Sequence, residues 1–225
     1  MFERLGRDLA RYFILESRNG SPGLLEKFGI VARFPTLHAV AIHRLGSWIY
    51  RTPLPLPARA AAKVVHHTAS FLTKVMWGID ISAGADIGGG LYIGHPGAIR
   101  IGPIKMGRDC SLSERVTIGR RTDGQGKNGL PEIGDRVWIG TGSVIFGEIH
   151  IGDGATIGPL TMVGRNVAPR TLVLGNPMQI VKRDHDNSVQ TYGSHPPADA
   201  LVSLPTDRAP AAPTSPVAAA SAARS

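Results

Sequence analysis

The residues between Ile81 and Ala168 repeat with a period of six, and this repeat limits the possible folds more than any other feature of the chain. Residues 133–168 divide without a gap into six hexads, each of which begins with Ile or Val. Written out, they are IGDRVW, IGTGSV, IFGEIH, IGDGAT, IGPLTM and VGRNVA. Five of the six continue with Gly, and each has a small or branched fifth residue. Such a repeat is typical of a triangular β-helix, in which three hexads form one turn of about eighteen residues.

The same frame covers residues 81–98 and resumes from Met106, displaced by one residue. We expect each leading aliphatic side chain to stack on the one a turn below, while the adjacent Gly permits the bend at the corner. A doubly wound α/β domain is excluded because residues 78–175 contain no long helical pattern. Two stretches interrupt the frame: IRIGPIK at residues 99–105 and TDGQGKNGLP at residues 122–131. We expect both to project outward as loops, where binding residues are commonly found.

The sequence therefore divides into three regions. Residues 1–77 are predicted to be α-helical, because apolar residues recur at spacings of three and four, as at Leu5, Leu9 and Phe13. Residues 78–183 are predicted to form the β-helix, so the fold class is mainly β with a helical N-terminal region. Residues 184–225 are rich in Pro, Ala and Ser with little to bury, and we expect a disordered tail.

Composition narrows the functional classes. Cys110 is the only cysteine, which excludes an intramolecular disulfide and a cysteine metal cluster and fits a cytoplasmic protein. Residues 1–77 hold 11 Lys and Arg against 4 Asp and Glu, so the basic charge lies mainly in the N-terminal third. Nucleic-acid binding is not expected, because no binding motif or aromatic platform accompanies the charge. Peripheral contact with an anionic membrane surface, or with an acidic polysaccharide, stays open.

His95 stands out because it lies in a segment, LYIGHPGAIRIG, whose other residues are mostly small or apolar. Asp80 precedes it by fifteen residues, slightly less than one coil, so we expect its carboxylate on the neighbouring coil within reach of the imidazole. A carboxylate that accepts from one ring nitrogen leaves the other free to act as a base towards a hydroxyl. The competing interpretation is an ordinary surface histidine at a corner.

Three segments carry a resemblance to a known family: GIDISAGADIGGGLYIGHPGAIRIG, SLSERVTIG and LVLGNPMQIVKR. Together with the helical TLHAVAIHRLGSWIYR, they resemble the serine acetyltransferases and the related polysaccharide O-acetyltransferases of the hexapeptide-repeat superfamily. The resemblance covers roughly residues 20–183. It implies a left-handed parallel β-helix that assembles as a homotrimer or a dimer of trimers, with active sites between adjacent β-helices.

The resemblance also implies the chemistry, which is transfer of an acetyl group from acetyl-CoA to an alcohol without a permanently bound cofactor. His95 would be the general base and Asp80 the group that orients it. In the loop, Gly124, Gly126 and Gly129 would let the backbone approach the pantetheine arm, and Lys127 would meet a CoA phosphate. Lys182 and Arg183 are further candidates for the phosphates, although a flexible loop and a solvated chain end explain these residues equally well.

The acceptor is the least constrained part of the prediction. Serine acetyltransferases usually have Asp directly before the catalytic His and an Arg-His-Pro run in the loop, whereas this chain has Gly94 and residues 129–131 as Gly-Leu-Pro. Unpaired charges of serine would cost several kcal/mol, by order of magnitude, so we expect a sugar hydroxyl of polysaccharide biosynthesis, with L-serine as the alternative. The chain ends in Ala-Arg-Ser without the terminal isoleucine of typical members, so no complex with cysteine synthase is expected.

Two functions from other classes compete with this interpretation. A zinc hydratase on the same β-helix needs three converging histidines, but the coils supply only His95 and His150, so no metal site is predicted. A non-catalytic β-helix scaffold would be expected to lack a base, whereas His95 and Asp80 are both present.

Overall fold

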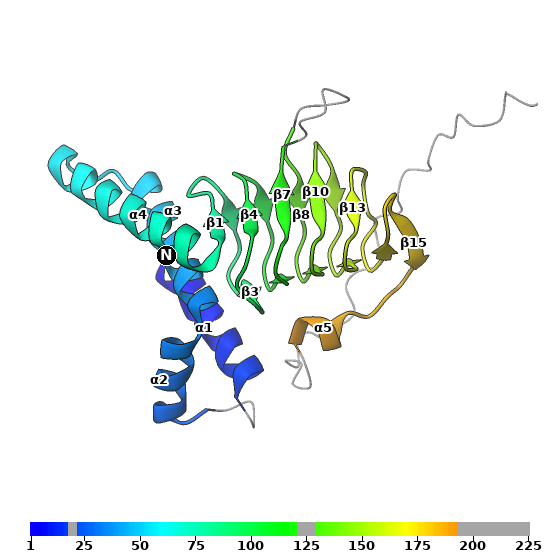
Figure 1. Ribbon diagram of the computed structural model, residues 1–225, viewed down its shortest axis with the longest axis horizontal. Coiled ribbons are helices and arrows are strands. Elements are labelled where there is room, and N and C mark those ends of the chain that lie inside the picture. Colours follow the sequence, from blue (N-terminus) through cyan, green and yellow to red (C-terminus); the bar gives the residue numbers. More distant parts are fainter. Residues whose placement is uncertain (18–21, 121–128, 193–225) are drawn as a thin grey trace, which may run out of the picture.

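The computed structural model of the 225-residue chain describes residues 1–17, 22–120 and 129–192. Four helices precede a solenoid of short strands, and a short helix follows it (Figure 1). The helices are α1 (Phe2–Glu16), α2 (Leu24–Arg33), α3 (Pro35–Arg51), α4 (Leu56–Trp77) and α5 (Ser188–Tyr192). The helical N-terminal region thus lies at one end of the solenoid.

The solenoid has three sheets, one on each side of a triangular coil. Sheet A contains β1 (Ile79–Ile81), β4 (Ile99–Ile101), β7 (Thr117–Gly119), β10 (Val144–Phe146) and β13 (Met162–Val163). Sheet B contains β2 (Asp86–Ile87), β5 (Lys105–Met106), β8 (Glu132–Ile133) and β11 (His150–Ile151). Sheet C contains β3 (Tyr92–Ile93), β6 (Ser111–Leu112), β9 (Trp138–Ile139), β12 (Thr156–Ile157), β14 (Leu172–Leu174) and β15 (Gln179–Lys182). Neighbouring strands pair in parallel, except β14 with β15, which are antiparallel.

The leading aliphatic residues of the hexads form the core, as the repeat predicts. In sheet C, Ile93 pairs with Leu112, Leu112 with Ile139, and Ile139 with Ile157. All four side chains are almost completely buried. Each contributes about 1.5–3 kcal/mol of burial free energy, and backbone pairing between coils satisfies the peptide groups. The thin prism is therefore held by aliphatic columns along its length.

Gly78 joins the helical region to the first coil. It ends α4 with φ +67° and lies so close to the next coil that a Cβ would be 2.7 Å from the backbone nitrogen of Ala98. Only glycine combines this left-handed backbone with the absence of a side chain. The helix can therefore turn directly into β1.

A buried ion pair attaches the helices to the first coil. The Asp8 carboxylate of α1 accepts hydrogen bonds from Arg44 Nε at 2.8 Å and Nη2 at 3.0 Å. The same carboxylate accepts from the backbone N–H groups of Gly90 and Leu91, at 2.7 and 2.8 Å. Arg44 of α3 also donates to the carbonyl of Ile87. Two helices and the first coil are thus joined through one carboxylate.

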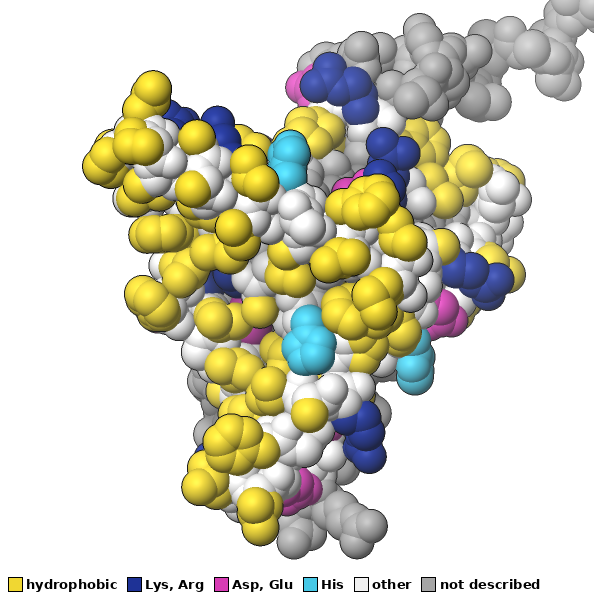
Figure 2. Space-filling model, turned by 60° about the vertical axis from the view of Figure 1, so that its left-hand side comes forward, with side chains coloured by type: hydrophobic (Ala, Val, Ile, Leu, Met, Phe, Trp, Pro, Cys, Tyr) yellow, Lys and Arg dark blue, Asp and Glu magenta, His cyan; other side chains and the backbone are white. Residues whose placement is uncertain are grey.

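The outer face of α4 is apolar. Val64, Val65, Phe71, Val75 and Met76 are each more than 60% exposed. Figure 2, which brings the helical end forward, shows hydrophobic side chains gathered over this part of the molecule. A contiguous apolar surface of this kind is typical of a surface that contacts another molecule. Within the parts of the chain that the structure describes, no helix combines the length and hydropathy of a membrane span.

The C-terminal prediction was wrong for residues 184–192, which were assigned to a disordered tail. They return along the solenoid and end in α5, which packs against α1. Asn187 Nδ2 donates to the Arg136 carbonyl at 2.7 Å, and the buried Arg11 donates to the Thr191 carbonyl at 2.5 Å. Polar partners therefore hold this segment although its sequence has few apolar residues. The remainder of the predicted tail, 193–225, lies outside the described residues.

Candidate active site

His95 lies in an insertion at the corner between sheets C and A. Six residues separate Ile93 from Arg100, whereas four separate the matching residues Leu112 and Thr117 in the next coil. The two additional residues make His95 exposed, outside the stacked corner. Gly97, with φ +126°, and Ala98, with φ +48°, return the chain to β4. The coil is therefore enlarged where the candidate base is located.

The expectation of an outward loop at residues 99–105 was wrong. Three residues connect Ile101 to Lys105, one fewer than the four that connect Ile81 to Asp86 in the coil below. The corner between sheets A and B is thus one residue shorter there, so after the two-residue insertion at His95 the frame resumes displaced by one residue. The hexad pattern showed that the frame had slipped but did not show which corner had gained residues.

The carboxylate of Asp80, the residue expected to orient His95, has another partner in the structure. Because the coil that carries His95 is 20 residues long, Asp80 pairs in register with Arg100. Its carboxylate forms an ion pair with Lys74 in the last turn of α4, at 3.0 Å. Among the described residues no hydrogen bond joins Asp80 to His95. The role of Asp80 in orienting the imidazole stays a prediction.

Glu114 occupies the same corner as His95, one coil further along. The pKa of its carboxyl group lies below the ordinary value, chiefly because its own backbone N–H donates to it, with help from the Thr141 hydroxyl. Electrostatic interactions with the nearby His95 and Arg115 lower it further. The sequence motif SLSERVTIG contains this residue, but its position beside His95 follows only from the coil alignment.

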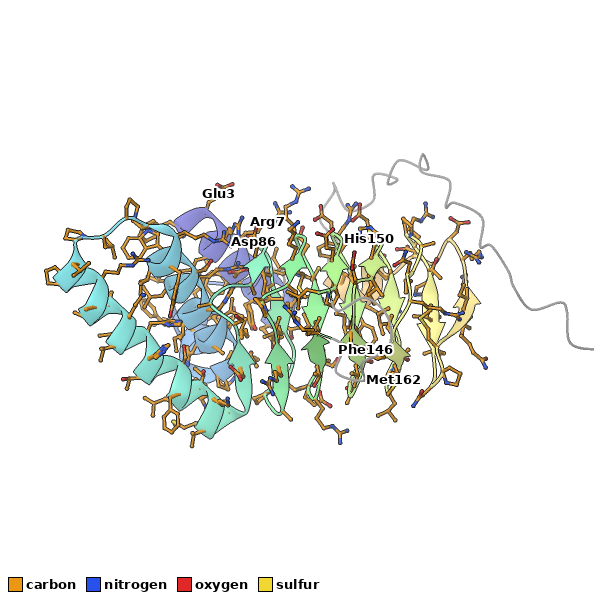
Figure 3. The ribbon with its side chains drawn as sticks, turned by 90° about the horizontal axis from the view of Figure 1, so that it is seen from above. Glu3, Arg7, Asp86, Phe146, His150 and Met162 are labelled. Atoms are coloured by element: carbon orange, nitrogen blue, oxygen red, sulfur yellow. The ribbon has the colours of Figure 1, made fainter. Side chains whose placement is uncertain are left out.

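A groove of about 620 Å³ crosses sheet A. Its floor is largely apolar and includes Val144, Phe146 and Met162, while Arg100 and Arg120 add positive charge to its lining. Figure 3 shows Phe146 and Met162 on the opposite side of the solenoid from Asp86 and His150. An apolar groove with a few charged groups suits a long ligand with both apolar and anionic parts. The corner that carries His95 borders the same sheet.

The loop residues divide into two groups. Gly124, Gly126 and Lys127 lie outside the described residues. At Gly129 a Cβ would be 2.5 Å from the Cβ of Glu148, so glycine is required there by close packing. The structure thus gives Gly129 a local packing role, and contact with a ligand stays a prediction.

Lys182 and Arg183 lie far from His95. Both are exposed and lie at or just after the end of β15, whereas His95 follows β3 at the opposite end of sheet C. Five strand spacings of about 4.8 Å place roughly 24 Å between the two ends. The structure therefore does not bring these cations to the candidate base, and contact with a distant phosphate stays a prediction.

His150, the second histidine of the coils, is also distant from His95. It pairs in register with Glu132 of the neighbouring strand on sheet B, whereas His95 lies at the corner between sheets C and A. No group of three His, Cys, Asp or Glu side chains suited to a metal ion occurs within residues 1–17, 22–120 and 129–192. The zinc hydratase interpretation therefore gains no support from the described residues.

Comparison with known proteins identifies the class and then the family. Residues 131–165 match the family described as "Bacterial transferase hexapeptide (six repeats)", so the β-helix is that of a hexapeptide-repeat transferase. The chain is 34% identical to serine acetyltransferase of Mycobacterium tuberculosis over 169 residues, which cover 75% of this chain and 70% of that protein. It is 29% identical to serine acetyltransferase of Helicobacter pylori over 164 residues, covering 72% and 91% of the two chains. The chain belongs to the serine acetyltransferase branch of the hexapeptide-repeat acyltransferases.

A solved structure agrees with this assignment. Serine acetyltransferase of Neisseria gonorrhoeae in complex with serine superposes with a TM-score of 0.63 at 28% identity, covering 79% of this chain and 68% of that chain. The left-handed parallel β-helix predicted from the sequence is thereby confirmed, and so is the prediction that the protein is an acyltransferase. The scaffold interpretation is not supported.

Proposed function

We propose that the protein transfers an acetyl group from acetyl-CoA to the side-chain hydroxyl of L-serine. The observation that carries this proposal is the 34% identity to a serine acetyltransferase across 75% of the chain. The sequence led us to expect a sugar acceptor, but that preference has no support among the relatives described above. L-serine, the alternative at the sequence level, therefore replaces it.

His95 acts as the general base in this proposal. Its exposed imidazole takes the proton from the acceptor hydroxyl as the oxygen attacks the thioester carbonyl of acetyl-CoA. Backbone N–H groups near the groove stabilise the negative charge that develops on the carbonyl oxygen. When the tetrahedral intermediate collapses, the C–S bond breaks and the protonated imidazole returns the proton to the CoA sulfur. The products are an acetyl ester and free CoA, and no covalent enzyme intermediate forms.

The groove on sheet A is the proposed site for the acyl donor. Phe146 and Met162 would contact the pantetheine arm, and Arg120 at the base of the loop would attract the phosphates. Because the His95 corner borders sheet A, a thioester lying along the groove can approach the imidazole. The loop residues Gly124, Gly126 and Lys127 are proposed to cover the arm.

Assembly is proposed from the exposed surfaces. The apolar outer face of α4 is what a homotrimer, or a dimer of trimers, would cover. The absence of a cysteine synthase complex was inferred from residues outside the described parts of the chain, and the relatives give it no support. A cytoplasmic location is consistent with the single cysteine, Cys110.

The test is release of CoA from acetyl-CoA by the purified protein, with L-serine or with a panel of sugars and oligosaccharides. We expect release with L-serine and a loss of roughly 10²–10⁴-fold in kcat for His95→Ala. His67→Ala is the matched control, because His67 is an exposed histidine on α4 away from the groove. Release with carbohydrates only would refute the serine assignment, and full activity of His95→Ala would refute the role of the imidazole.

A further inference from the structure

At the corner between sheets C and A, the carboxylate of Glu114 lies one coil further along than the candidate base, His95. The backbone N–H of Arg115 donates to the carbonyl of Gly97 at 2.8 Å, which joins the corner of Glu114 to the corner of His95. A Cβ on Gly97 would be 4.0 Å from the Cβ of Glu114. Glu114 therefore stands over the insertion that carries His95.

The backbone on the other side of Glu114 is also fixed. Its carbonyl accepts from the backbone N–H of Gly142 at 3.0 Å, and Arg115 adopts φ +58° immediately after it. The Thr141 hydroxyl assists the carboxylate from the next coil. Glu114 thus stands half-buried on a rigid corner, which suits a residue that recognises a ligand.

The two carboxylates near the site differ in the partners they already have. Asp80 forms an ion pair with Lys74 at 3.0 Å. Glu114 forms no ion pair with Lys or Arg among the described residues within 4.0 Å. Its negative charge is therefore available to a cationic ligand beside His95.

The position directly before His95 carries no charge. Gly94, directly before His95, has no side chain. The residue aligned with Gly94 on the next coil is Ser113, which is uncharged. An acceptor bound at this corner thus meets the imidazole of His95 and the carboxylate of Glu114, with the exposed Arg115 beside them. Adjacent coils are about 4.8 Å apart, so a small acceptor can contact both.

We propose that Glu114 is a specificity residue that binds an ammonium group of the acceptor while His95 takes the proton from its hydroxyl. The acceptor then carries an amine on the carbon next to the hydroxyl-bearing carbon, as L-serine does. This inference rests on the proposed O-acetyl transfer and deepens it, because it names the group that selects the acceptor.

The test compares acceptors that differ only in the amine. The pairs are L-serine with hydroxypropionate, ethanolamine with ethylene glycol, and glucosamine with glucose, with the O-acetylated product identified by mass spectrometry. Wild-type protein should favour the amine-bearing member of a pair. Glu114→Gln should raise the KM of that member about tenfold or more, because a hydrogen bond between charged groups is lost, and should leave the KM of acetyl-CoA unchanged.

Glu132→Gln is the matched control, because Glu132 lies on sheet B in an ion pair with Lys105, away from the His95 corner. It should leave both KM values unchanged. An equal preference for amine-free acceptors in wild-type protein, or an unchanged preference in Glu114→Gln, would overturn the role of Glu114. Transfer to ethanolamine or glucosamine but not to L-serine would refute the serine assignment and still support Glu114, so the two proposals fail separately.

Discussion

Asp8→Ala should be among the most destabilising single substitutions in the helical region. It leaves the Arg44 guanidinium, only 3% exposed, without its counter-charge, and it leaves the N–H groups of Gly90 and Leu91 without their acceptor. Removing one partner of a buried pair costs about 3–5 kcal/mol, and each orphaned N–H adds about 1–3 kcal/mol. Because Arg44 keeps the Ile87 carbonyl and these losses overlap, we expect about 4–6 kcal/mol in the free energy of unfolding.

Urea unfolding followed by circular dichroism, at one fixed protein concentration, measures this change. The double variant Asp8→Leu with Arg44→Met should be less destabilised than Asp8→Ala, because it leaves no buried charge unpaired. Arg4→Gln is the control, since its ion pair with Asp86 is 42% and 49% exposed and should matter by at most about 1 kcal/mol. A loss below about 1 kcal/mol in Asp8→Ala would refute this account of how the helices are attached.

Four further predictions concern other parts of the molecule. Burial lowers the pKa of His43 to about 3, so unfolding is favoured as pH falls from about 6.5 towards 3, by at most about 1.4 kcal/mol per pH unit. His43→Gln should remove that part of the pH dependence in urea unfolding, and an unaltered slope would contradict the assignment. Leu160 is exposed and has a left-handed backbone, with φ +54°, so Leu160→Gly should relieve strain and raise the melting temperature by about 2–4 °C. Gly142, in the same column, has φ +72°, so Gly142→Ala should lower the melting temperature. The opposite order of melting temperatures would argue against backbone strain at these two positions. Burial raises the pKa of the Cys110 thiol to about 12, so a thiol reagent should react only as the chain unfolds in urea, and rapid reaction with the folded protein would disagree. Phe146→Ala should raise the KM of acetyl-CoA roughly fivefold or more with little change in kcat, whereas a rise confined to the acceptor KM would place the donor elsewhere.

The core was predictable from the sequence because one rule generates it. A hexad that begins with Ile or Val turns one aliphatic side chain inward on each side of the coil, so the columns through Ile93, Leu112 and Ile139 follow from counting. The period also located the change from helix to coil near Gly78, where a left-handed residue is required. Local periodicity and local backbone preference carry this information, and both are visible in sequence.

The geometry of the candidate site was less predictable because it depends on the length of each corner. A coil of eighteen residues would pair Asp80 with Ala98, but the actual coil has 20 residues and pairs Asp80 with Arg100. The same insertion places His95 beside Glu114, a residue to which the sequence alone gave no role. Residues that mismatch the hexad frame show that a coil is irregular, but only the pairing of strands shows where the additional residues protrude.

Contacts between distant segments were not predictable at all. The hydrogen bonds of Asp8 and the packing of residues 184–192 along the solenoid join residues far apart in sequence through polar groups. No periodic pattern in the sequence marks these contacts. Residues 184–192 contain few apolar side chains, but the backbone carbonyl of Thr191 still serves the buried Arg11.

The hydrogen bond from Arg11 to the Thr191 carbonyl joins residues 180 positions apart. During synthesis on the ribosome, Arg11 emerges long before its last acceptor exists. At 5–20 residues per second the interval is roughly 10–40 s. For that period the first helix lacks a partner that it has in the finished protein, so a slowly translated chain exposes α1 to chaperones and proteases for longer. The N-terminal helix of this protein is thus completed last, although it is made first.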